Sequence, residues 1–325
     1  MNHAARGRAA RGALAAFLLA GWASGCTHAP WHPYRGWRAW KTANVTVYAD
    51  TVTAPSLTQQ WMEDSYQVLE ATFFAGYDVP PVEVIEVQPG ADSPFVNDSG
   101  GKRLEVAFAG LPVAGQPRAL LMVGGKSQMW EQTHVLVHHF IAAALPGAPM
   151  WFHEGLAVYL MGFRQSDRQP DVICFGLRRP ASVQGILEPL PTLFTSGWND
   201  HNDRMGRHLA FTSYGLVDYL LHGRERTLRP EFRGLMTALR GHPTGDAALR
   251  ATYPADVVDH LADDVPAHIR HVEEPNLCPL PYRMGLVRRA RTEASVTPVP
   301  EATMKAFFEA MTALPARDGY ADFFP

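Results

Sequence analysis

The stretch that decides the fold runs from Trp130 to Met161 and reads WEQTHVLVHHFIAAALPGAPMWFHEGLAVYLM. Pro146, Gly147 and Pro149 interrupt it, and a proline such as Pro149 suits the first turn of a helix. The stretch therefore predicts a helix, a turn, and a second helix from Met150 to Met161.

Three side chains of this helix pair are of the types that bind a divalent metal. His134 and His138 are four residues apart, so on a helix their imidazoles share one face and can meet a single ion. Since 14 histidines in 325 residues give about one such pair by chance, the spacing needs independent support. Glu154, near the start of the second helix, provides it, because a returning helix can aim its carboxylate at the two imidazoles. Without a metal, the same three residues would form a hydrogen-bonded buried cluster.

Gly155 follows this glutamate inside the second helix. A glycine there costs about 1 kcal/mol relative to alanine. Its presence fits a close approach of two helices beside Glu154, or simply tight packing.

Upstream of the helix pair, short strands dominate. Residues 45–49 (VTVYA) alternate between apolar and other side chains, which predicts a strand, and Leu57 to Phe74 has helical spacing. Further β-type runs lie at Val82 to Val87, Leu104 to Ala109 and Ala119 to Val123. Strands ahead of helices favour an α+β domain over a doubly wound sheet.

The helix pair resembles the peptidase-MA-like gluzincins, whose pattern is H-E-x-x-H, a loop, and P-x-W-x-x-E-G-x-A. His134 and His138 match the two histidine ligands, and Glu154 in WFHEGLA matches the glutamate ligand. The resemblance covers about residues 40–270. It implies a zincin-like fold with a small N-terminal sheet plus helices, an active-site helix and a helical C-terminal half. It also implies zinc, whereas nitrogen and oxygen donors alone fit several divalent ions.

One position departs from the family pattern. Where gluzincins place the glutamate that deprotonates the attacking water, this chain has Val135, which cannot accept a proton. Loss of a positioned general base lowers the rate by about 10²- to 10⁴-fold. The resemblance therefore implies a catalytically impaired metallopeptidase domain that serves as a metal- or protein-binding module. The alternative is an active zinc metallopeptidase that uses an unorthodox base.

Four other residues are weaker candidates for catalysis. Glu131 shares a helical stripe with Val135, but helical side chains lean toward the N-terminus, which points its carboxylate away from the site. His139 and His153 each adjoin a proposed ligand and can titrate near neutrality, although both positions also suit a hydrogen-bonded histidine at a helix edge. Tyr214 is a candidate to stabilise an oxyanion in an active relative, or an aromatic residue that packs under the site.

The first 25 residues predict a signal peptide rather than part of the fold. Three arginines precede the apolar run ALAAFLLA (13–20), which is too short to cross a bilayer. The sequence ASGC that ends at Cys26 resembles the bacterial lipobox, with alanine in place of the usual leucine, and implies lipidation of that cysteine. An ordinary secretory signal is the alternative. Thr27 implies, by similarity to sorted lipoproteins, the outer membrane facing the periplasm.

The rest of the chain divides into three parts. A tether occupies residues 26–39, the zincin-like domain residues 40–270, and a proline-rich strap with a C-terminal helix residues 271–325. The pattern of residues 301–314 predicts that helix, which either docks on its own domain or binds a partner.

The charge balance excludes one class of partner. Lys and Arg number 29 against 32 Asp and Glu, a net charge of −3, with no basic stripe dense enough to neutralise phosphates. Nucleic acid is therefore excluded. The expected partners are the membrane, through the lipid at Cys26, and a protein or peptide in a groove of the domain. In the periplasm the remaining thiols, Cys174 and Cys278, are permitted to form a disulfide, but the sequence does not give their separation.

Overall fold

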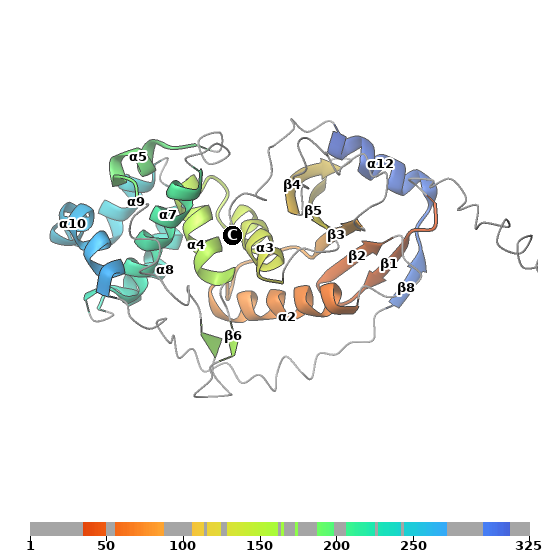
Figure 1. Cartoon of the computed structure of the whole chain (residues 1–325), viewed down its shortest axis with the longest axis horizontal. Helices are drawn as coiled ribbons and strands as arrows, with labels where there is room; N and C mark the ends of the chain where they lie inside the picture. The colour runs from red at the N-terminus through yellow and green to blue at the C-terminus, as the bar shows by residue number, and fades with distance from the viewer. Residues whose placement is uncertain are drawn as a thin grey trace, which may run out of the picture. The chain divides into compact units, whose positions relative to one another are not determined.

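The structure is a computed structural model (Figure 1). It describes residues 35–49, 56–87, 106–113, 116–124, 129–161, 164–165, 173–174, 187–197, 206–224, 227–241, 244–271 and 295–312. The predicted signal peptide, the lipidation site Cys26, residues 26–34 of the tether and Cys278 lie outside these residues. Within the described residues, no helix has both the length and the apolar composition needed to cross a membrane.

Six of the strands form one mixed sheet in the order β4-β5-β3-β2-β1-β8. Their bounds are Arg38–Lys41 (β1), Val45–Ala49 (β2), Val82–Val87 (β3), Val106–Val113 (β4), Gln116–Gly124 (β5) and Ser295–Pro298 (β8). β3 runs parallel to both β2 and β5, and the other pairs are antiparallel. Valines of the two central strands face each other in register, as at Val45↔Val82 and Val47↔Val84, and all four are buried in the core. A separate antiparallel pair joins β6 (Arg164–Gln165) to β7 (Ile173–Cys174).

The sequence patterns predicted the inner strands better than the outer ones. β2 and β3 have the predicted bounds, whereas β4 and β5 are displaced or longer because they pair along a hairpin that closes at Val113↔Gln116. β1 and β8 were not predicted. β8 lies inside the predicted strap, and all four of its residues are exposed, so backbone pairing with β1 forms it without any apolar alternation. The mixed α+β class is confirmed, although the last strand of the sheet, β8, comes after most of the helices in the chain.

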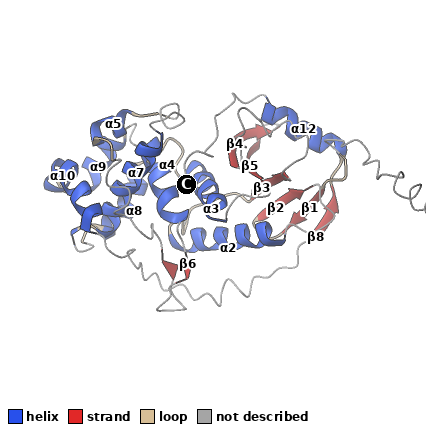
Figure 2. Cartoon of the chain, in the orientation of Figure 1, coloured by secondary structure: helices blue, strands red, loops and turns tan. Residues whose placement is uncertain are grey.

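In Figure 2, α5 and α7 to α10 lie on the side of α4, whereas α2 and α12 lie beside the sheet. The bounds of the helices are Ser56–Thr72 (α2), Met129–Ala144 (α3), Met150–Met161 (α4), Leu190–Thr195 (α5), Gly206–His222 (α7), Arg229–Ala238 (α8), Gly245–Thr252 (α9), Ala255–His271 (α10) and Glu301–Thr312 (α12). α4 has the predicted bounds. It follows a turn in which Gly147 has φ +94°, a left-handed conformation that favours glycine.

α3 and α4 lie where the sheet meets the helical half of the domain. α3 contacts α2, β4, β5 and α4, and α4 packs in turn against α7. Every residue of α4 is buried, as expected for a helix that is apolar on all sides. A Cβ built on Gly155 would lie 2.4 Å from the backbone oxygen of Ser213 in α7. The close helix approach beside Glu154 is therefore confirmed.

The C-terminal helix α12 contacts β4, the edge strand at the opposite end of the sheet from β8. Met304 of this helix is fully buried. These contacts favour the first of the two predicted roles, a helix docked on its own domain.

Candidate metal centre

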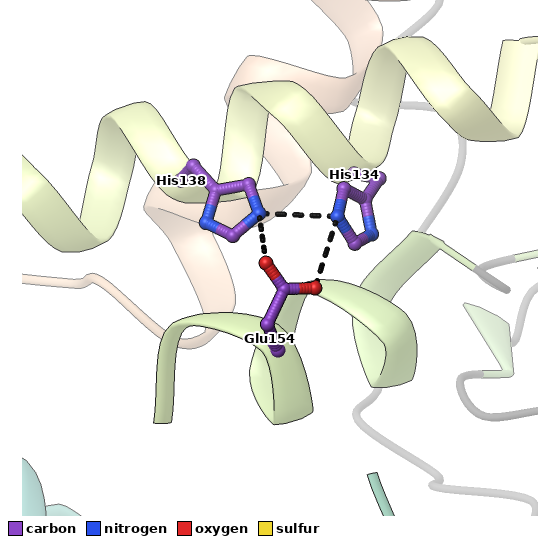
Figure 3. A group of neighbouring side chains, drawn as sticks. All are labelled: His134, His138 and Glu154. Carbon is purple, nitrogen blue, oxygen red and sulfur yellow. Dashed lines mark hydrogen bonds and ion pairs between the residues drawn. The ribbon is translucent and has the colours of Figure 1, made fainter. Parts of the chain in front are cut away.

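Three side chains from α3 and α4 converge on one point (Figure 3). The Nε2 atoms of His134 and His138 are 3.0 Å apart. Glu154 Oε2 lies 3.6 Å from Nε2 of His134, and Oε1 lies 3.3 Å from Nε2 of His138. Each carboxylate oxygen thus faces a different imidazole, and the three residues singled out from the sequence are brought together.

The separations fit a tetrahedral ion. Ligand atoms about 2.0–2.1 Å from a tetrahedral zinc lie about 3.3 Å from one another. Two of the measured separations are close to that value: the two imidazole nitrogens are 3.0 Å apart, and Oε1 of Glu154 lies 3.3 Å from Nε2 of His138. The separation of 3.6 Å from Nε2 of His134 belongs to the other carboxylate oxygen, Oε2. Two imidazole nitrogens and one carboxylate oxygen would leave a fourth coordination position open.

Burial gives the centre an electrostatic character that also suits a cation. His134 is 4% exposed, and His138 and Glu154 are each 1% exposed. Burial first, and the neighbouring His138 second, lower the pKa of His134 to about 3 against the opposing effect of Glu154. His134 is therefore neutral at physiological pH, which is the form that binds metals. A buried carboxylate beside a neutral imidazole is stabilised by a compensating positive charge, which a divalent ion would supply.

His153 lies against the edge of the His138 ring that faces away from Glu154. Its Nδ1 lies 3.4 Å from Nδ1 of His138, the ring nitrogen that points away from Glu154. Burial, followed by the effect of His138, lowers the pKa of His153 to about 3. With so low a pKa, this imidazole is a weak base.

His139 is directed elsewhere. Its Nε2 donates a hydrogen bond of 2.8 Å to the backbone oxygen of Pro80, just before β3. Burial lowers the pKa of this imidazole, and the bond to Pro80 opposes the shift. His139 therefore joins α3 to the segment that enters the sheet.

The structure shows a contact for one of the two remaining candidates, Tyr214. The hydroxyl of Tyr214 donates to Asp218 Oδ1 at 3.4 Å, one turn along α7. Val135 is 2% exposed and belongs to the hydrophobic core. Glu131 lies in α3, but its side chain is outside the described part of the structure. The position that follows His134 is thus occupied by an apolar side chain in the core.

Two side-chain contacts were not predicted from the sequence. The contact between His153 and His138 depends on how two helices cross, which spacing within one helix does not report. The second is a part-buried pair on the helical side, where His268 Nε2 of α10 lies 2.7 Å from Asp218 Oδ2 of α7. These residues are 50 positions apart, and no local pattern marks them.

No family model matches the sequence, and no curated protein matches it. The function must therefore be inferred from the residues of the centre.

Proposed function

We propose that this chain is an envelope lipoprotein whose zincin-like domain binds one divalent metal through His134, His138 and Glu154 and has little or no peptidase activity. The observation that carries the proposal is the convergence of these three buried residues, whose ligand atoms lie within 4.8 Å of one another. Zinc is proposed from the resemblance to gluzincins.

The fold proposed here is of the gluzincin type. What supports it is the order of the parts: a small mixed sheet, then a helix that carries both histidines and contacts β4 and β5, then a second helix that carries the glutamate. A helical half follows, from α5 to α10.

The proposed loss of catalysis depends on what surrounds the donors. When bound, zinc would supply a Lewis acid that polarises a peptide carbonyl. Catalysis also needs a group that accepts a proton beside it, and Val135 occupies that position in the core. Of the two adjoining histidines, His139 is bonded to Pro80, and the low pKa of His153 makes it a weak base. Protein or peptide binding is therefore the activity proposed for this domain.

Metal content and hydrolysis test the proposal together. Purified full-length protein, offered zinc and then desalted, should retain about one zinc per chain by elemental analysis. It should not hydrolyse an unfolded protein substrate in a chelator-sensitive way. Absence of bound zinc would overturn the metal site. Strong chelator-sensitive hydrolysis that disappears in His134→Ala would instead establish an active metallopeptidase.

The proposed location has its own test. Cys26→Ser should release the protein from the membrane fraction or stop its processing, because the lipid would have no attachment point. Unchanged membrane attachment of Cys26→Ser would contradict the lipid anchor.

A further inference from the structure

His153 and Glu154 are adjacent in α4, yet they reach opposite edges of one imidazole. Successive residues of a helix are rotated by about 100°. Glu154 Oε1 lies 3.3 Å from Nε2 of His138, and Nδ1 of His153 lies 3.4 Å from Nδ1 of the same ring. Both nitrogens of this metal-ligand candidate thus face groups supplied by one helix.

The two imidazoles meet edge to edge. Their planes are 20° from parallel, and their centroids are 5.6 Å apart. Nearly parallel rings with centroids this far apart and two nitrogens at 3.4 Å lie side by side rather than face to face. Side-by-side rings point a nitrogen lone pair of one at the N–H of the other, which is the arrangement of a hydrogen bond.

The chemistry of metal binding fixes the direction of that bond. A neutral imidazole has one N–H and one lone pair. If Nε2 of His138 gives its lone pair to a metal, the proton must be on Nδ1. A buried N–H of this kind needs an acceptor, and metal-binding histidines usually donate theirs to a nearby protein group.

We propose that His153 is a positioning residue of the metal centre: its Nδ1 accepts the hydrogen bond from Nδ1–H of His138 and so holds Nε2 of His138 toward Glu154. This inference rests on the proposed metal-binding function. It assigns to His153 a contact with a metal-ligand candidate, at a position that the pattern P-x-W-x-x-E-G-x-A leaves unspecified. His153 is not a fourth ligand in this arrangement, because its nitrogen faces the far edge of the His138 ring from Nε2.

Three variants separate positioning from packing. His153→Phe keeps a flat ring of similar size but removes the acceptor. His153→Asn restores an acceptor, since its side-chain oxygen occupies about the place of Nδ1. His139→Phe is the matched control, because His139 is equally helical, also buried and next to the same ligand, but bonds to Pro80. All three are made in the full chain.

Zinc affinity, measured by competition with a chromophoric chelator, should fall about 10- to 100-fold in His153→Phe. It should return to within a few-fold of wild type in His153→Asn and change little in His139→Phe. In zinc-loaded protein with ¹⁵N-labelled histidine, a slowly exchanging Nδ1–H signal from His138 should be present in wild type and His139→Phe. It should be absent or fast-exchanging in His153→Phe.

Wild type that binds no zinc would contradict the proposed function itself. Wild type that binds zinc while His153→Phe binds it equally well would leave that function standing and overturn the positioning role. A loss of affinity of the same size in His139→Phe would also overturn it, because the effect would then be one of packing.

Discussion

Two clusters among the described residues combine imidazole with a buried carboxylate, and they are built differently. Between α7 and α10, Asp218 Oδ2 lies 2.7 Å from Nε2 of His268, and Oδ1 accepts a hydrogen bond from Tyr214 at 3.4 Å. Between α3 and α4, each oxygen of Glu154 faces a different imidazole, with Oε1 3.3 Å from Nε2 of His138 and Oε2 3.6 Å from Nε2 of His134.

The difference distinguishes a link between two helices from a group that could hold a metal ion. A short bond between His268 and Asp218 stabilises the packing of α10 on α7 without any further component. At Glu154, donor atoms from three buried residues lie within 4.8 Å of one another, so the group could hold a metal ion. Residue types alone do not distinguish the two clusters, whereas the placement of the donors does.

The largest expected effect comes from removing one imidazole from each cluster. His138→Ala should weaken zinc binding by about 10³-fold or more, because one of three ligands is lost. His268→Ala should leave zinc binding at the wild-type level and lower the free energy of unfolding by about 1–3 kcal/mol. Isothermal titration and urea denaturation measure the two quantities. Equal loss of zinc in both variants would show that the comparison is wrong.

A carboxylate placed at position 135, directly after His134, should give the next largest effect. Val135→Glu in zinc-loaded protein should raise chelator-sensitive hydrolysis of an unfolded substrate by about 10²- to 10⁴-fold over wild type. Val137→Glu is the control, because Val137 is equally buried in the same helix but two positions away. Both variants bury a charge and should lose stability. Only the first should gain activity.

An equal gain in Val137→Glu would assign the hydrolysis to something other than the general base. A folded, zinc-loaded Val135→Glu without any gain would show that more than this one residue separates the centre from an active one.

Gly155 lies between the two clusters, because α4 carries one of them and α7 belongs to the other. A Cβ at this position would lie 2.4 Å from the Ser213 backbone oxygen and 2.7 Å from Cγ2 of Val217. Backbone cannot move aside locally, so Gly155→Ala should lower the free energy of unfolding by about 1–3 kcal/mol. Gly241→Ala, where the nearest heavy atom is 3.9 Å away, should change it by less than about 0.5 kcal/mol. Urea denaturation of both variants tests the expectation.

Some parts of this structure could be predicted from the sequence, and there are physical reasons why the other parts could not. α4 was predicted with its bounds because Pro149 favours a helix start and the apolar run is continuous. The three donors were predicted because spacing and turn direction are local properties. β8 was not, because an exposed edge strand is held by backbone bonds that leave no side-chain pattern. The pairings of His153 with His138 and of His268 with Asp218 depend on how helices cross, which is a tertiary property.

The smallest expected effect, and the sharpest test of the comparison, comes from changing each carboxylate to the amide of the same shape. Asp218→Asn should lower the free energy of unfolding of the metal-free protein by about 1–2 kcal/mol, because the amide nitrogen would replace an acceptor that a donor now faces. Glu154→Gln should change it by less than about 1 kcal/mol or raise it. A buried charge is removed there, and the amide can donate to an imidazole nitrogen. Zinc affinity should respond in the opposite order, falling strongly in Glu154→Gln and staying at the wild-type level in Asp218→Asn. If Glu154→Gln destabilised the metal-free protein as much as Asp218→Asn does, and zinc affinity were unchanged, both clusters would be structural links and the ion site would be ruled out.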